Sequence, residues 1–165
     1  MQTVFFNLWR KASFFFVVFM LLWCYRTLPD SIAYAHNENG EPISWVDKQT
    51  FFYVSTAIIV VFNLLMGLAK NALSKLDFSK INPQSEWANA KESLSELIEG
   101  WFNSFMAFVN TTLVFIFLGL NGINRTNEQL LDKNYNWLLI FLALALMAFT
   151  FFIPLRLLFS QPKQN

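Results

Sequence analysis

The sequence has one cysteine, one histidine and almost no net charge. Cys24 can form neither a disulfide within the chain nor a zinc cluster of several thiolates. The net charge of +1 provides no basic face of the kind that neutralises phosphates. These shortages exclude a disulfide scaffold and a cysteine-rich metal site, and they argue against nucleic-acid binding.

Charged residues are also missing from the central parts of four long apolar stretches. Apolar residues make up 55% of the 165-residue chain, which contains 20 phenylalanines. A soluble domain of this size has too little interior to hide so many large side chains, whereas a lipid bilayer can surround them. We therefore predict an all-α, polytopic membrane protein with one domain, 1–165. Its four transmembrane helices are expected to form two hairpins, with spans at about 10–28, 51–72, 101–121 and 136–158.

The first apolar stretch has an alternative interpretation as a cleaved signal peptide. Arg10 and Lys11 would form its basic start, and Ala33-Tyr34-Ala35 would form a cleavage motif of small residues. The spacer between Arg26 and Ala35 is long, polar and charged, which does not fit such a motif. A retained first span is therefore favoured.

Basic residues flank the four spans unevenly, and this bias predicts their orientation. Lysine and arginine are enriched in the cytoplasmic loops of membrane proteins. One side carries Arg10, Lys11, Lys70, Lys75, Lys80, Lys91, Arg156 and Lys163, and the other carries Arg26, Lys48, Arg125 and Lys133. We therefore expect both termini in the cytoplasm, an outer loop at 28–48 and an inner loop at 77–100.

The outer loop holds the histidine and several carboxylates, but no arrangement that fixes a reaction. Oxygen and nitrogen ligands occur at Asp30, His36, Glu38, Glu41 and Asp47, without the spacing of known metal sites. No serine or cysteine adjoins His36 in the sequence as a nucleophile. We therefore predict no catalytic residue, metal or cofactor, and a solvated loop with turns at Asn39-Gly40 and Glu41-Pro42.

Polar residues within the predicted spans are amides and hydroxyls rather than ionisable groups. They are Asn63, Asn103, Asn110, Thr111 and Thr112. Such side chains commonly hydrogen-bond between membrane helices, whereas pumps and channels usually keep charged groups inside the membrane. Interhelical hydrogen bonding is therefore the favoured role, and lining a substrate path is the alternative.

Two further segments carry helical signals. Residues 84–100 combine an apolar face with an acidic one, which predicts a cytoplasmic amphipathic helix. This helix either lies on the membrane, contacts a partner or extends the third span. In the next polar loop, Thr126 and Gln129 have the spacing of a capping box, which predicts a helical turn starting there.

The outer loop resembles a known bacterial pattern. The residues concerned are Leu28-Pro29, Ile32, Asn37, Gly40, Pro42, Trp45 and Lys48. They are similar to the domain-of-unknown-function module that precedes the second half of SdpI-type immunity proteins, over about residues 10–70. The resemblance implies a small bacterial inner-membrane protein, and some members of that family confer immunity to a secreted toxic peptide or sense it. The chain departs from the pattern at Ala33, Ala35 and His36, where the family has a proline, a histidine and an aromatic residue.

Three hypotheses about function follow. The leading one is a non-enzymatic inner-membrane protein that binds a peptide or protein partner through the outer loop. Its candidate partner-binding residues are Pro29, His36, Asn37, Gly40, Glu41, Trp45 and Lys48. The alternative is an accessory structural subunit of a larger membrane complex, whose phenylalanine-rich surface makes the contacts. The third is a small transporter.

Overall fold

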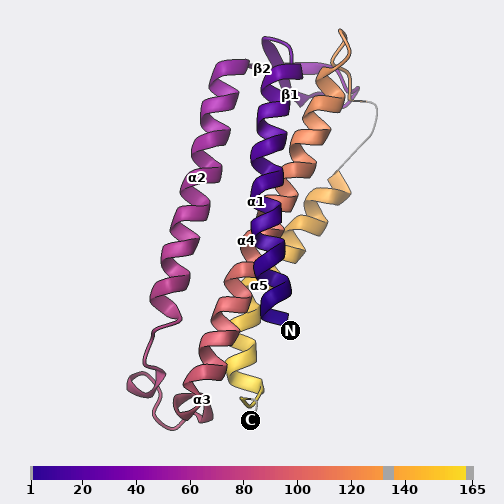
Figure 1. Cartoon of the computed structure of the whole chain (residues 1–165). Coiled ribbons are helices and arrows are strands. Elements are labelled where there is room, and N and C mark those ends of the chain that lie inside the picture. The colour runs from indigo at the N-terminus through magenta and orange to yellow at the C-terminus, as the bar shows by residue number, and fades with distance from the viewer. Residues whose placement is uncertain (1, 132–135, 163–165) are drawn as a thin grey trace.

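The computed structural model describes residues 2–131 and 136–162. Its elements in chain order are α1 (Gln2–Thr27), β1 (Ser31–His36), β2 (Pro42–Asp47), α2 (Lys48–Leu73), the 3-10 helix η1 (Phe78–Lys80), α3 (Glu86–Asn89), α4 (Lys91–Asn124) and α5 (Asn136–Phe159). Figure 1 shows the long helices with the β1–β2 hairpin at one end and α3 at the other. Lys133 and Lys163, which contribute to the predicted orientation, lie outside the described residues.

Four helices are long and apolar enough to cross a membrane, as predicted. They are α1, α2, α4 and α5. The last three contain the expected spans at 51–72, 101–121 and 136–158, and α1 covers the expected span at 10–28 except for its last residue. The helices extend beyond most of the predicted limits, because α1 begins at Gln2 and α4 reaches Asn124. This mostly helical arrangement indicates a multi-pass membrane protein.

Helix α4 is the centre of the fold, and its main partner is α1. The two helices run in the same direction along a shared seam (Figure 1). On α4 the buried Asn103, Asn110, Phe117 and Asn124 recur every seven residues, a spacing typical of a continuous helix–helix contact. The Sγ atom of Cys24 on α1 lies 3.5 Å from the carbonyl oxygen of Phe117. The expected grouping into two hairpins therefore does not describe the packing.

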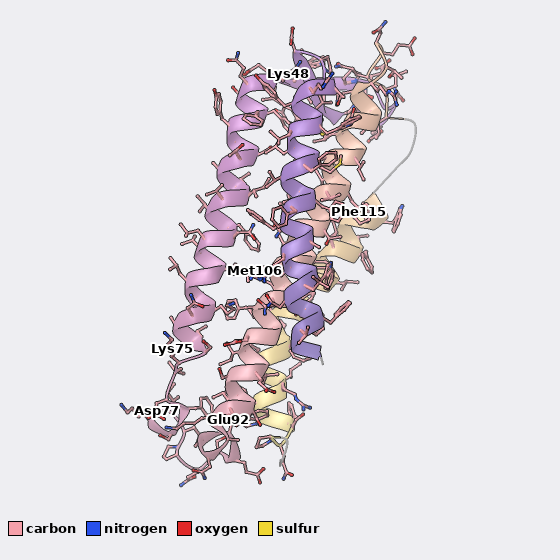
Figure 2. The ribbon with its side chains drawn as sticks, in the orientation of Figure 1. Lys48, Lys75, Asp77, Glu92, Met106 and Phe115 are labelled. Atoms are coloured by element: carbon pink, nitrogen blue, oxygen red, sulfur yellow. The ribbon has the colours of Figure 1, made fainter. Side chains whose placement is uncertain are left out.

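Helices α2 and α5 contribute much less to the interior. Within the most apolar 18 residues of each, 6% of α2 and none of α5 is buried inside the chain. Figure 2 shows the same contrast within α4, where Met106 lies at the centre of the helices and Phe115 points outward. The apolar surfaces of α2 and α5 are therefore compatible with contact with lipid.

The polar residues of the spans have different partners. Asn63 on α2 and the fully buried Asn110 on α4 exchange two amide hydrogen bonds, both 3.0 Å long. Thr111 instead donates to the carbonyl oxygen of Ala107 in its own helix, and Thr112 is half-buried. The Oδ1 atom of Asn103 is buried and has no hydrogen-bond partner among the described residues. The Asn63–Asn110 pair therefore links α2 to the centre of the fold.

The expected amphipathic helix at 84–100 is divided between two elements. Residues Glu86–Asn89 form α3, whose Trp87 and Ala88 are buried, and the chain then breaks at Ala90. From Lys91 the helix continues through Gly100 into the third span without interruption. Of the alternatives considered, an extension of the third span is the one observed, and it begins at Lys91 rather than at Gln84.

Asp47 ends β2 and caps the N-terminus of α2. Its side chain accepts a hydrogen bond of 2.8 Å from the backbone N–H of Thr50. The hydrogen bonds from Thr50 lower the pKa of Asp47 below its ordinary value of 3.8. A lowered pKa means that the ionised cap stabilises the fold above that value, and that this contribution is lost as the pH falls through the folded-state pKa.

Replacement of Asp47 by alanine is therefore expected to lower the thermal unfolding temperature at neutral pH. The difference from the unsubstituted protein should shrink as the pH is lowered below about 4, where the native carboxylate becomes protonated. Unfolding in one detergent across a pH series measures this. A difference that stays constant down to about pH 2 would show that the charge of Asp47 contributes nothing.

Candidate functional site

The outer loop folds into an antiparallel β-hairpin. Ser31 pairs with Asp47 and Ala33 with Trp45, and the register shifts twice, which leaves Tyr34 on β1 and Ile43 on β2 without partners. Isoleucine, valine and aromatic residues favour these short extended segments. The hairpin corrects two predictions, since the fold is mostly but not purely helical and the segment 28–48, predicted as a solvated loop with turns, contains two paired strands.

The turn between the strands is organised by Asn37. Its Oδ1 atom accepts 2.9 Å hydrogen bonds from the backbone N–H groups of Asn39 and Glu41. Its Nδ2 atom donates to Glu41 Oε2 at 2.8 Å. Gly40 completes the turn with a φ of +81°, a conformation that glycine adopts without steric cost. A turn at Asn39-Gly40, as predicted, is therefore present.

Asn124, the last residue of α4, hydrogen-bonds to β1 and so attaches the hairpin to the helices. Its Oδ1 atom accepts a hydrogen bond of 2.7 Å from the backbone N–H of Ala33. Its Nδ2 atom donates to the carbonyl oxygens of Ala33 and Leu120, both at 3.0 Å. Ala33 is fully buried and Asn124 is 3% exposed, so this one side chain satisfies both backbone groups of a buried strand residue.

Gln129, in the segment that follows α4, hydrogen-bonds to both strands of the hairpin. Its Oε1 atom accepts from Trp45 Nε1 and its Nε2 atom donates to the carbonyl oxygen of Ser31, both at 2.8 Å. Its own carbonyl oxygen lies 2.9 Å from His36 Nε2. With a φ of 52°, Gln129 is not in a helix. The predicted capping box is therefore wrong, because this side chain bonds to the hairpin and the segment after α4 forms turns.

Most of the candidate partner-binding residues thus have partners within the chain. Lys48 forms an ion pair of 3.2 Å with Asp30 and donates its backbone N–H to the Asp30 carbonyl oxygen. Pro29 lies two residues after the end of α1 at Thr27. Together with His36, Asn37, Gly40, Glu41 and Trp45, these residues shape the hairpin or attach it to the helices. The structure brings all seven together at one end of the molecule (Figures 1 and 2).

Two outward-facing residues were not predicted from the sequence, Tyr34 and Ile43. Tyr34 is 60% exposed, Ile43 is 57% exposed and Trp45 is 49% exposed, which gives the hairpin an apolar outer surface. Ile43 and Trp45 lie two residues apart on β2, so a strand prediction would have placed them on one face. We call Tyr34, Ile43 and Trp45 the hairpin surface.

The hairpin has one occupied edge and one open edge. The outward backbone groups of β1 are bonded by Asn124 and Gln129. Trp45 lies opposite Ala33 in the register, and the backbone groups of Ala33 point away from β2. In an antiparallel pair of this kind, the backbone N–H and C=O of Trp45 likewise point away from β1. No hydrogen bond to these outer groups occurs among residues 2–131 and 136–162. Within the described residues, the outer edge of β2 therefore has no hydrogen-bonded neighbour.

At this end of the molecule the hairpin presents the exposed side chains of Tyr34, Ile43 and Trp45. In the part of the chain that is described, no group of three His, Cys, Asp or Glu side chains is placed to hold a metal ion.

Comparison of the chain with protein-family models, curated proteins and solved structures finds no match.

Proposed function

We propose that the chain is a non-enzymatic, multi-pass protein of a bacterial inner membrane whose hairpin binds an extended peptide or protein segment outside the membrane. Both termini would lie in the cytoplasm, as the basic residues predict. The open edge of β2 is the observation that carries the proposal. The resemblance of the outer loop to SdpI-type immunity proteins supports the same class of partner, a secreted peptide.

Strand addition is the mode of binding that fits this edge. An extended peptide can pair with an exposed strand, and backbone hydrogen bonds then give affinity while neighbouring side chains give specificity. Unprotected edges invite such pairing, and proteins usually block them with charge or proline. β2 carries a proline and a carboxylate only at its two ends, Pro42 and Asp47, and the four residues between them are uncharged. The exposed Ile43 and Trp45 would contact apolar side chains of the added segment.

Introducing a charged residue at the edge of β2 tests whether a partner binds there by strand addition. A photo-crosslinking amino acid in place of Tyr34, used in cells that make the full chain, is expected to give one discrete polypeptide adduct. Ile43→Lys on the same background should reduce that adduct at least about fivefold, because a strand-edge lysine opposes pairing. Ile81→Lys is the matched control, since Ile81 is 62% exposed and lies outside the hairpin.

Two results would contradict the proposal. Adducts with lipid alone would indicate that Tyr34 and Trp45 anchor the hairpin at the membrane surface, where such aromatics are common. An adduct that Ile43→Lys and Ile81→Lys reduce equally would show that the edge of β2 is not involved.

An accessory subunit of a larger complex is the second candidate, favoured by the exposure of α2 and α5. Helices that bury almost none of their apolar windows within the chain have faces available to other membrane helices. Purification in mild detergent distinguishes the two functions. A stable complex of fixed stoichiometry that survives Ile43→Lys favours the accessory role, whereas an isolated chain favours the hairpin. No observation in the described residues favours the third hypothesis, a small transporter.

A further inference from the structure

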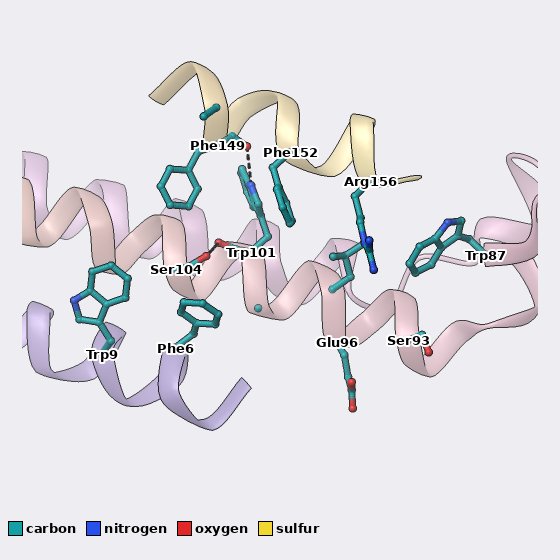
Figure 3. Close-up of a pocket in the computed structure, with 13 residues that line it drawn as sticks. Phe6, Trp9, Trp87, Ser93, Glu96, Trp101, Ser104, Phe149, Phe152 and Arg156 are labelled. Atoms are coloured by element: carbon teal, nitrogen blue, oxygen red, sulfur yellow. Dashed lines mark hydrogen bonds between the residues drawn. The ribbon is translucent and has the colours of Figure 1, made fainter. Parts of the chain in front are cut away.

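A cleft of about 620 Å³ lies at the opposite end of the molecule from the hairpin. Its walls come from the N-terminal turns of α1, the first half of α4 and the second half of α5, with α3 beside them (Figure 3). It is lined by Phe6, Trp9, Trp87, Ser93, Glu96, Leu97, Gly100, Trp101, Ser104, Ala148, Phe149, Phe152 and Arg156. The volume falls within the usual range for a ligand site, about 300–1,000 Å³.

The aromatic wall of this cleft is held in place. Trp101 Nε1 donates a hydrogen bond of 2.7 Å to the carbonyl oxygen of Phe149, which joins α4 to α5. The Trp101 ring also stacks on Phe105, with centroids 5.1 Å apart and an interplanar angle of 10°. A wall fixed in this way keeps its shape when the cleft is filled, which lowers the cost of binding.

One end of the cleft is closed and carries a cation. Trp87 is 4% exposed, and its Nε1 atom donates to the carbonyl oxygen of Ser160 at 2.9 Å, so α3 is bound to the end of α5. Figure 3 shows Arg156 extending from α5 between α4 and Trp87, whereas Glu96 points away on the other side of α4. Within the described residues Arg156 forms no ion pair.

We propose that the cleft binds an anionic phospholipid of the bilayer. One acyl chain lies against Trp101, Phe149 and Phe152, and the phosphate is bound by Arg156. The cleft lies between α1 and α5, two helices that are apolar enough to cross the membrane, so lipid is the ligand in contact with its opening. A guanidinium binds phosphate through two parallel hydrogen bonds, and Arg156 is the cation that lines the cleft. This site is separate from the hairpin, and its failure would leave the proposed function untouched.

The role of the Arg156 charge is tested by measuring which lipids the full chain retains. After solubilisation and incubation with equal amounts of phosphatidylglycerol and phosphatidylcholine, native mass spectrometry should show about fivefold more bound phosphatidylglycerol, the factor expected from one basic group near an anionic surface. Arg156→Gln should bring this ratio close to one, and Arg156→Lys should retain most of it. Lys75→Gln is the matched control, because it removes the same charge near the same end of the molecule but outside the cleft (Figure 2).

A second test fills part of the cleft with a larger side chain and measures whether lipid is still retained. A Cβ atom at Gly100 would meet nothing within 4 Å, and Gly100 lines the cleft, so we expect the side chain of Gly100→Leu to extend into the cleft. This variant should retain several-fold less of both lipids. Gly67 is equally open but does not line the cleft, so Gly67→Leu should retain both lipids normally. The proposal is overturned if the unsubstituted protein holds both lipids equally, if Arg156→Gln leaves the ratio unchanged, or if the two leucine variants behave alike.

Discussion

Replacement of Asn124 by alanine is expected to release the hairpin from the helices. The substitution removes the partners of both the N–H and the C=O group of Ala33, which is fully buried. An unsatisfied buried polar group costs about 1–3 kcal/mol, so leaving two of them costs about 2–6 kcal/mol. A two-stranded hairpin is barely stable alone in water, so β1 is expected to move away and hydrate these groups rather than stay docked.

Hydrogen exchange measures this release directly. Backbone amides of β1 should exchange at least about 30-fold faster in the Asn124→Ala variant, since about 2 kcal/mol corresponds to roughly that factor. Amides near Asn63 and Asn110 should keep their protection, because that pair lies elsewhere on α4. The cross-link from position 34 should also weaken, since the hairpin surface depends on this attachment.

Two variants control for simpler explanations. Asn121 also lies near the end of α4, but its amide donates to the exposed Thr27 hydroxyl, so Asn121→Ala should leave β1 protected. Asn124→Asp keeps an acceptor for the Ala33 N–H but loses the donor to its carbonyl oxygen, and it adds a buried charge. It should therefore release the hairpin as well. Equal protection of β1 in all three variants would show that apolar packing of Ile32 and Leu28 alone holds the hairpin.

The helical part of the fold was predictable because its signal is local. A run of about 20 apolar residues needs no partner to be recognised, and all four spans lie where these runs occur. The seam between α1 and α4 was not predictable. In a membrane protein the lipid-facing residues are as apolar as the buried ones, so apolar periodicity does not mark the buried face of α1. The seven-residue spacing of Asn103, Asn110 and Asn124 marks one face of α4, but it does not show which helix packs against that face.

The hairpin was missed because its stabilising partners are distant in sequence. Its strands are six residues long, and β1 contains alanine and histidine, which are poor indicators of a strand. The residues that fix them, Asn124 and Gln129, follow roughly 90 positions later in the chain. The capping-box prediction failed for the same reason, since local spacing could not show that Gln129 bonds to Trp45 and Ser31 instead.

The residues shared with the SdpI-type pattern have structural roles here. Leu28 and Ile32 are buried beneath the hairpin, Asn37 and Gly40 form its turn, and Lys48 joins its two ends. Under the proposed function, specificity for a partner depends on exposed residues outside this set, including Tyr34 and Ile43.

Replacement of Gly40 by alanine is expected to separate the hairpin turn from the segment that follows α4. Gly40 is buried, and its carbonyl oxygen accepts a 2.9 Å hydrogen bond from the backbone N–H of Leu131. A non-glycine residue at its φ of +81° costs about 1–3 kcal/mol, and the added Cβ would overlap the Leu131 carbonyl oxygen. Thermal unfolding in detergent should show the loss of stability, and proteolysis near residue 131 should become faster.

The same substitution elsewhere in the chain should have the opposite effect. Gly122 lies in α4 with open space around its Cα, so Gly122→Ala should stabilise the helix by about 1 kcal/mol. Gly40→Asn separates the two causes of the loss, because asparagine tolerates a positive φ but still carries the overlapping Cβ. If Gly40→Asn is as destabilised as Gly40→Ala, the close approach to Leu131 causes most of the loss of stability. The turn then serves to pack the hairpin against the segment that follows α4. If Gly40→Asn is nearly normal, the backbone conformation causes most of the loss and the contact with Leu131 can shift.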